Sequence, residues 1–397
     1  MAGGDLFWLV AVTVGPAAML CWMTLYPVRR SAVRLGLMDQ PGGHSTHLHV
    51  TPLGGGIGIY VGVAGTLLLG WIVIGSVASD TTSIASRASA WLGPPESLVQ
   101  LSGGVLDRSA TAFGLMCGGT ILALLGLADD RATVSPWWRL AVEFGVAAYV
   151  VLGLQIELTA FIDARWLTRL LSMVWIVGVI NSFNMLDNMD GLSGGVAAII
   201  AISMAAVMLS TSNADSGQPQ YLVASLLLVT GGSLLGFLWH NRPPAKIFMG
   251  DSGSYFVGYL IATAMLMATY VAGGVESENH VSRPHGVLAP LCAMAVPLYD
   301  MMTVLWIRVR SGRSVLSGDR SHFSHRLVDL GLSKVQAVAT IYLLTATCGL
   351  AAILLVNVSV YQSWMVVGIV VCMLLLIIIL ESTAWQQDTA VDEPAGR

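Results

Sequence analysis

Charged residues are scarce in this chain. Only 11% of its 397 residues are Asp, Glu, Lys or Arg, whereas a soluble globular protein carries about 25%. Lysine is almost absent, because only two of the 19 basic residues are lysines, Lys246 and Lys334. The chain has no basic run of the kind that binds nucleic acid. The composition therefore argues against a soluble fold and against a nucleic-acid partner.

Cysteine is also sparse, and its five positions fall in apolar stretches without the spacing of a metal site. We interpret them as small buried apolar residues. They are Cys21, Cys117, Cys292, Cys348 and Cys372. The N-terminus lacks the basic segment and small-residue cleavage site of a signal peptide. We therefore expect the first apolar stretch to remain as a helix.

Long apolar stretches are what the chain has in excess, with 55% hydrophobic residues and a mean hydropathy of +0.74. A membrane-spanning helix needs about 20 apolar residues, and only helices or closed barrels satisfy the backbone in lipid. We predict an all-α polytopic membrane helical bundle with about eleven transmembrane helices. The predicted membrane domain is 1–380, and 381–397 is a polar, frayed cytoplasmic tail.

The predicted spans share length and lack of alternation, and 138–155 and 192–210 are the weakest of them. They lie at 6–26, 53–76, 109–128, 138–155, 168–185, 192–210, 221–239, 253–273, 286–307, 335–356 and 361–380. If the loop with Arg29, Arg30 and Arg34 is inside, inside segments hold 14 Lys and Arg residues and outside loops hold five. The positive-inside rule then predicts an outside N-terminus and an inside C-terminus.

Acidic residues gather on the predicted inside. Seven aspartates lie there in loops or at helix ends: Asp39, Asp129, Asp130, Asp187, Asp190, Asp251 and Asp319. Carboxylates at membrane depth are costly and usually functional. One such residue is commonly a solvated helix cap, but several in short Gly-rich segments are poorly explained in that way. We therefore expect an acidic active site at the cytoplasmic face.

The strongest segment runs from Asn181 to Leu192. Asn181, Asn184 and Asp187 recur every three residues and so share one helix face, and Asp190 continues the row. Oxygen ligands in this arrangement suit a hard cation such as Mg²⁺. A structural cap would need only one of these residues.

Two further segments carry aspartate at helix ends. In Asp129-Asp130 one carboxylate can hold a cation or proton while the other braces it, although the pair alone is weak evidence. Asp251 lies between Gly250 and Gly253 at the start of the eighth predicted helix. An ordinary N-cap is the alternative interpretation of Asp251.

The longest inside loop combines basic, acidic and histidine side chains. They are Asp300, Arg308, Arg310, Arg313, Asp319, Arg320, His322, His325 and Arg326. Such a group can bind a pyrophosphate. An ordinary positive-inside loop would explain its arginines but not its histidines.

Together these motifs resemble the polyprenyl-phosphate N-acetylhexosamine-1-phosphate transferases, the glycosyltransferase family 4 that includes WecA-like and MraY-like membrane enzymes. The resemblance covers about 39–332, with the motifs in family order. They are Asp39-x-Pro41 with His47, Pro52 and Gly55-Gly56; Asp129-Asp130; Asn181 to Leu192; Phe248 to Gly253; and Asp319-Arg320 with His322-x-x-His325-Arg326-Leu327. The chain has His44-Ser45 where the family commonly has Arg-Lys, and Ser324 where it has a histidine.

The resemblance implies transfer of a sugar 1-phosphate from a UDP-N-acetylhexosamine to polyprenyl (undecaprenyl) phosphate, with release of UMP, to initiate cell-envelope glycan synthesis. The expected donor is UDP-N-acetylglucosamine, the expected cofactor Mg²⁺ or Mn²⁺, and the expected location the inner membrane, with a homodimer as one arrangement. The implied site residues fall into three groups. Catalytic residues are Asp129, Asp130, Asp187 and Asp190; substrate-binding residues are His47, Asn181, Gly191, His322, His325 and Arg326; metal ligands are Asp251 and Asn184.

Other functions remain as alternatives. An MraY-type enzyme would use a UDP-muramoyl-peptide donor, but the His-Phe-Ser-His-Arg stretch is more WecA-like. A transporter or flippase often carries internal repeats, and the chain has no evident repeat. An intramembrane aspartyl protease would need glycine where Phe248 stands. A non-catalytic scaffold would not need the acidic set.

Overall fold

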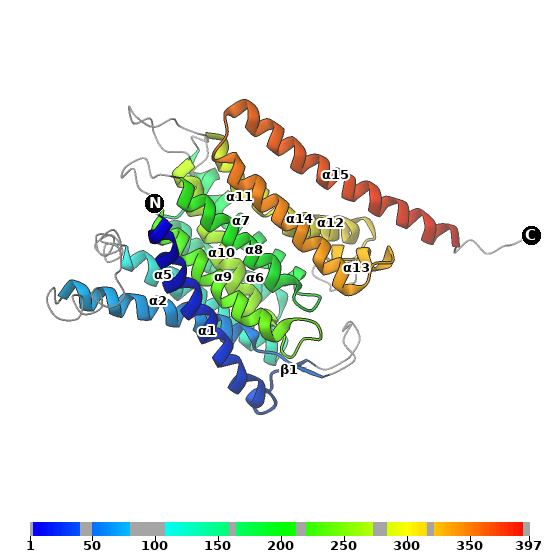
Figure 1. Ribbon diagram of the computed structural model, residues 1–397. Helices are drawn as coiled ribbons and strands as arrows, with labels where there is room; N and C mark the ends of the chain where they lie inside the picture. Colours follow the sequence, from blue (N-terminus) through cyan, green and yellow to red (C-terminus); the bar gives the residue numbers. More distant parts are fainter. Residues whose placement is uncertain are drawn as a thin grey trace, which may run out of the picture.

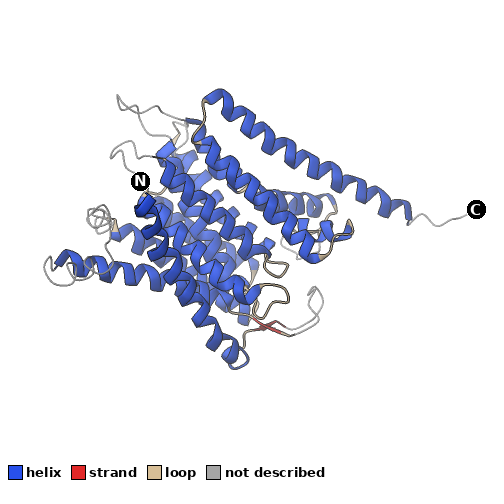
Figure 2. Cartoon of the chain, in the orientation of Figure 1, coloured by secondary structure: helices blue, strands red, loops and turns tan. Residues whose placement is uncertain are grey.

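The computed structural model describes residues 3–39, 50–79, 108–158, 164–211, 220–272, 284–315 and 321–391. These residues are almost entirely helical (Figure 2). Their one sheet pairs β1 (Met38–Asp39) with β2 (Thr51–Pro52) in antiparallel register, and Asp39 lies opposite Thr51. The prediction of an all-α polytopic bundle is confirmed.

Each predicted apolar stretch corresponds to helix in the structure. The first half contains α1 (Gly3–Leu35), α2 (Gly55–Ser79), α5 (Ser109–Arg131), α6 (Pro136–Ala148) and the π-helical turn η1 (Tyr149–Gly153). Next come α7 (Arg165–Leu186), α8 (Leu192–Ser210), α9 (Tyr221–Asn241) and α10 (Gly250–Ala272). The last part has the 3₁₀ turn η2 (Pro284–Leu288), α11 (Ala289–Ala293), α12 (Ala295–Arg310), α13 (Phe323–Asp329), α14 (Lys334–Leu355) and α15 (Val360–Val391).

Nine helices among the described residues are long and apolar enough to cross a membrane, or ten with one bent pair. The prediction of about eleven helices is close to this number. The stretch 138–155 accounts for the difference, because its α-helix has only 13 residues and carries Arg139 and Glu143. The weak prediction at 192–210 is α8, which passes as a span.

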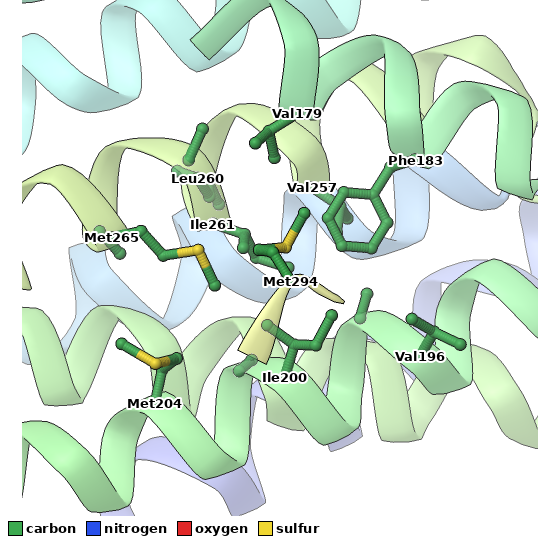
Figure 3. Packing of buried hydrophobic residues seen from close by; sticks show 14 of the residues in the cluster. Val179, Phe183, Val196, Ile200, Met204, Val257, Leu260, Ile261, Met265 and Met294 are labelled. Carbon is green, nitrogen blue, oxygen red and sulfur yellow. The ribbon is translucent and has the colours of Figure 1, made fainter. Parts of the chain in front are cut away.

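The bent pair joins 286–293 to α12 at an angle of 60°. Pro297 explains the position of the break, because it lacks an N–H and its ring clashes with the carbonyl four residues earlier, at Ala293. Met294 lies at the break and points into the core (Figure 3). One predicted span thus becomes two short helices.

Helix α10 forms the centre of the bundle, and 94% of its most apolar stretch is buried. It packs against α5, α7, α2 and α9. Around Met294, side chains of α7, α8 and α10 interlock (Figure 3). Those labelled include Val179, Phe183, Val196, Ile200, Met204, Leu260, Ile261 and Met265. The buried centre fixes where the first turn of α10 lies.

Helix α15 lies along α14 and continues away from the bundle (Figure 1). The start of α1 and the end of α15 lie at opposite ends of the structure, as an outside N-terminus and an inside C-terminus require. Residues 381–391, predicted to be frayed, belong to this helix. The orientation across a membrane stays a prediction.

Candidate active site

The predicted acidic segments meet where α5 ends and α10 begins. Asp130, in the last turn of α5, accepts hydrogen bonds from the backbone N–H groups of Asp251 (2.8 Å) and Ser252 (3.2 Å). The first N–H groups of a helix have no partner within it. Asp130 therefore acts as an N-cap supplied by another helix, and it fixes the backbone that carries Asp251.

Glycine permits this close approach. A Cβ on Gly126 would lie 2.4 Å from the carbonyl oxygen of Asp251, a distance that no side chain tolerates. Gly250 has a φ of +72°, in the left-handed region that favours glycine. A Cβ there would also lie 2.7 Å from the carboxylate of Asp130.

The predicted metal ligands are neighbours. Asn184, in the last turn of α7, donates through Nδ2 to Asp251 Oδ1 at 2.6 Å and to Ser254 Oγ at 3.2 Å. The structure thus brings Asp251 and Asn184 together although 67 residues separate them. In this arrangement the amide nitrogen, rather than the amide oxygen, faces the carboxylate.

Asp129 is surrounded by donors. Its side chain is 3% exposed and forms a 2.8 Å salt bridge with Arg139 of α6. The Tyr255 hydroxyl (3.1 Å) and the Val134 backbone N–H (2.8 Å) also donate to it. These contacts favour the ionised carboxylate and fix the guanidinium at the end of α5.

Asn181 points away from Asp251. Its Nδ2 donates to Glu143 of α6 at 2.6 Å and to the Val177 carbonyl at 2.9 Å. Glu143 is only 1% exposed. The three-residue spacing placed Asn181 on the correct helix, but α6 determines what its amide contacts.

The turn between α7 and α8 is built from the predicted Asp187, Asp190 and Gly191. Burial, followed by the charge of Asp130, raises the pKa of Asp187 to about 7. Asp190 Oδ2 accepts from the Ala245 N–H at 3.0 Å, whereas its buried Oδ1 has no hydrogen-bond partner. Gly191 has a φ of +78° and donates its N–H to Asn241 Oδ1 at 2.8 Å.

Helix α13 places the histidines beside this turn. Ser324 Oγ donates to Asn188 Oδ1 at 2.5 Å and so joins α13 to the turn after α7. At the start of α13, Asp300 accepts the Phe323 N–H at 2.6 Å and lies 3.0 Å from His322 Nδ1. The rings of His322 and His325 are 6.5 Å apart.

Arg326 has a different position from the one that we predicted. Its Nε donates to Glu381 of α15 at 3.0 Å, its Nη2 to Thr303 Oγ1 at 3.0 Å, and its Nη1 to the Ser321 carbonyl. The residue is 7% exposed. Three of the five guanidinium N–H groups therefore donate within the protein and orient the side chain toward α15 and α12; a contact of Arg326 with a diphosphate stays a prediction.

Comparison with known proteins agrees with this arrangement. The model of the family described as "Glycosyl transferase family 4" matches residues 112–269. These residues include both carboxylates at the end of α5, the Asn181–Leu192 segment and Asp251. Over these residues the chain is similar to glycosyl transferase family 4.

Proteins similar to this chain include N-acetylglucosaminyl 1-phosphate transferases. The chain is 29% identical to the probable undecaprenyl-phosphate N-acetylglucosaminyl 1-phosphate transferase of Bacillus subtilis, over 88% of this chain and 86% of the relative. It is also 29% identical to the decaprenyl-phosphate N-acetylglucosaminephosphotransferase of Mycolicibacterium smegmatis, over 92% and 86%. The Escherichia coli K12 undecaprenyl-phosphate alpha-N-acetylglucosaminyl 1-phosphate transferase is 25% identical over 81% and 77%. These matches confirm the resemblance inferred from the motifs.

The oxygen ligands of this site suit Mg²⁺ in one specific way. Among the described residues, no three Asp, Glu, His or Cys side chains form a group that could hold a metal ion by themselves. Mg²⁺ commonly takes only one or two protein ligands and completes its shell with water and substrate phosphate. Asp251 and Asn184 fit that pattern of one carboxylate and one amide, and their role as ligands stays a prediction.

Several predicted residues lie outside the described residues, namely His47, His44, Ser45, Asp319 and Arg320. The β1–β2 pair nevertheless leads from Asp39 toward Asp251. The Phe248 N–H donates to the Pro52 carbonyl at 2.9 Å, and the Gly55 N–H donates to the Phe248 carbonyl at 2.9 Å. Strand β2 and the start of α2 therefore lie close to the first turn of α10.

Three functional neighbours were missed from the sequence. Arg139 and Glu143 lie within an apolar stretch, so their charge at membrane depth was an available signal. Glu381 follows the last apolar stretch and resembles an ordinary polar boundary residue. Only the path of α15 past α13 reveals its partner.

Proposed function

We propose that this protein transfers N-acetylglucosamine 1-phosphate from UDP-N-acetylglucosamine to a polyprenyl phosphate and releases UMP. The observation that carries the proposal is the contact of Asp130 with the start of α10 at Asp251, together with the Asn188–Ser324 hydrogen bond that joins the histidine helix α13 to the turn after α7. Two relatives are named as N-acetylglucosaminyl 1-phosphate or N-acetylglucosamine phosphotransferases that use undecaprenyl or decaprenyl phosphate. An acidic site beside histidines also suits a bound cation facing a diphosphate.

Two anionic substrates must meet at this site, beside several carboxylates. Bound Mg²⁺ would neutralise the diphosphate and the departing UMP. Asp251 offers the carboxylate, and Asn184 offers an amide oxygen once its amide group turns over. Asp130 keeps Asp251 in place through the backbone of α10.

Asp129 positions Arg139 for the lipid phosphate. The second pKa of a phosphate monoester is about 6, so at pH 7 most of it is already doubly ionised. A strong base is therefore unnecessary, and a carboxylate stabilised by three donors is a weak one. A lipid phosphate oxygen attacks the β-phosphorus, the bond to the bridging oxygen breaks, and UMP leaves with the bonding electrons.

His322 and His325 face the donor diphosphate. Asp300 holds Nδ1 of His322, which leaves Nε2 as the nitrogen that meets a phosphate oxygen. His325 lies one helical turn farther along α13 and adds a second contact.

The site faces the cytoplasm in this proposal. The charge bias of 14 to five places the loops around Asp130, Asp190 and Asp251 inside. A nucleotide sugar is water-soluble and reaches the site from that side, while the lipid phosphate lies in the membrane. The protein would thus reside in the inner membrane and initiate a cell-envelope glycan.

A donor panel tests the function. Purified protein is incubated with Mg²⁺, undecaprenyl phosphate and either UDP-N-acetylglucosamine or a UDP-muramoyl-peptide, and released UMP is measured. We expect UMP with the first donor and none without the lipid. UMP only with the second would favour the MraY-type alternative, and none with either would refute the proposal.

A further inference from the structure

Helix α15 has an unusual attachment to the bundle. Only 17% of the most apolar stretch of α15 is buried. The helix diverges from α14 toward its C-terminal end (Figure 1). Glu381 is one of the few buried residues of this helix, with 9% exposure directly after the exposed residues 378–380. A buried carboxylate at this place requires a specific partner.

Both oxygens of Glu381 are used. Oε1 accepts from Arg326 Nε at 3.0 Å, and Oε2 accepts from the Tyr299 hydroxyl at 2.6 Å. The rings of Tyr299 and Phe323 lie 6.0 Å from the guanidinium carbon of Arg326. One side chain of α15 therefore binds α12 and α13 together.

Stability alone is a weak explanation for this pair. A buried ion pair often contributes no more than well-packed apolar residues of similar size would. What the pair adds is direction, because a planar guanidinium accepts partners only along fixed N–H axes. The contacts of Arg326 with Glu381, Thr303 and Ser321 thus fix the rotation of α13 about its axis.

This contact completes the attachment of a short helix. Helix α13 is held at its start by Asp300 and on the side of the acidic turn by Asn188. Seven residues of helix are too short to be stable without tertiary contacts. Without Glu381, the buried guanidinium of Arg326 would have only neutral acceptors, the Thr303 hydroxyl and the Ser321 carbonyl.

We infer that Glu381 is a positioning residue that sets, through Arg326, where His322 and His325 present themselves to the donor diphosphate. The inference rests on the proposed function for its substrate, but the contact itself can be tested without turnover. It assigns a role to the end of α15, which lies outside the 112–269 region matched by the family. Glu381 itself need not touch the substrate.

The test compares Glu381→Gln with Glu381→Asp and Tyr299→Phe. Glu157→Gln is the matched control. Glu157 is also paired with arginines, Arg165 and Arg169, but it lies between η1 and α7 rather than in α15. For Glu381→Gln we expect the KM for UDP-N-acetylglucosamine to rise about 10-fold, the cost of a lost charge-assisted hydrogen bond. The KM for polyprenyl phosphate should stay unchanged. The KM of Glu381→Asp for UDP-N-acetylglucosamine should lie between those of the wild type and Glu381→Gln.

Hydrogen–deuterium exchange of peptides within 321–332 provides the readout that needs no activity. Exchange should be faster in Glu381→Gln than in wild type and unchanged in Glu157→Gln. Wild-type protein that fails to turn over any donor would refute the proposed function, and exchange alone would then decide whether Glu381 fixes α13.

Two results would overturn the inference. The first is Glu381→Gln with wild-type exchange in α13. The second is a fall in kcat that leaves both KM values unchanged, as loss of folded enzyme would produce. If Glu381→Gln does not fold, Tyr299→Phe removes only one hydrogen bond of the carboxylate and carries the same comparison.

Discussion

Replacing Asp130 with asparagine should loosen the start of α10 and, with it, the placement of Asp251. The Asp130 carboxylate accepts two backbone N–H groups of α10, from Asp251 and Ser252. Asparagine has one acceptor oxygen, so its NH₂ group would face one of these donors. The negative charge at the helix N-terminus is lost as well.

The two losses can be estimated. A helix N-cap is worth about 1 kcal/mol, and a favourable charge near a partly buried helix end adds up to about 2 kcal/mol. Since asparagine keeps one acceptor, we expect Asp130→Asn to lower the free energy of unfolding by about 2 kcal/mol. The Mg²⁺ concentration for half-maximal rate should rise, because the backbone at Asp251 and Ser252 is no longer held by two hydrogen bonds to residue 130.

Thermal unfolding in detergent and UMP release against Mg²⁺ concentration measure both effects. Asp329→Asn is the matched control, because Asp329 is exposed at the end of α13. Asp130→Asn should melt a few degrees below this control. Equal melting temperatures would refute the capping role, and lost turnover at full stability would point to direct participation in catalysis.

Three further predictions concern the metal, the carboxylates and the topology. EDTA should abolish transfer and Mg²⁺ or Mn²⁺ should restore it; full activity in chelator would exclude the proposed metal. Asp251→Asn and Asp129→Asn should each lower turnover, by about 10-fold for Asp129 because it positions Arg139. A loss of about 10²–10⁴-fold in Asp129→Asn, typical of a lost proton-transfer group, would contradict that role. Excess Mg²⁺ should raise the rate of Asp251→Asn only, and rescue of Asp129→Asn would contradict its assignment. In a variant that lacks Cys117 and Cys372, a cysteine introduced by Lys334→Cys should react with a membrane-impermeant thiol reagent only after the reagent is given access to the inner face of the membrane. Labelling in intact cells would contradict the predicted topology.

Local sequence patterns were enough to predict the helices and the polar segments. Apolar length located each helix because lipid leaves the backbone few alternatives. Spacing placed Asn184 near the end of α7, and glycine beside Asp251 indicated a close backbone approach, which Gly126 provides from α5. These signals operate over one or two helical turns.

The remaining features depend on contacts between distant helices. Spacing alone could not show that Asn181 faces Glu143, because that contact depends on how α6 lies against α7. The number of spans differs from about eleven for a related reason, since α6 is short and ends in a π-helical turn. The sequence pattern favoured Arg326 as a phosphate ligand, and it could not show that Arg326 Nε lies 3.0 Å from Glu381 Oε1, because that contact depends on the path of α15.

The central claim is that the β-phosphate of the donor moves with the sugar. UDP-N-acetylglucosamine labelled in its β-phosphate should transfer the label to the polyprenyl lipid while unlabelled UMP appears in the aqueous phase in equal amount. Recovery of the label in released UDP, with a lipid that gains the sugar but no phosphate, would contradict the account.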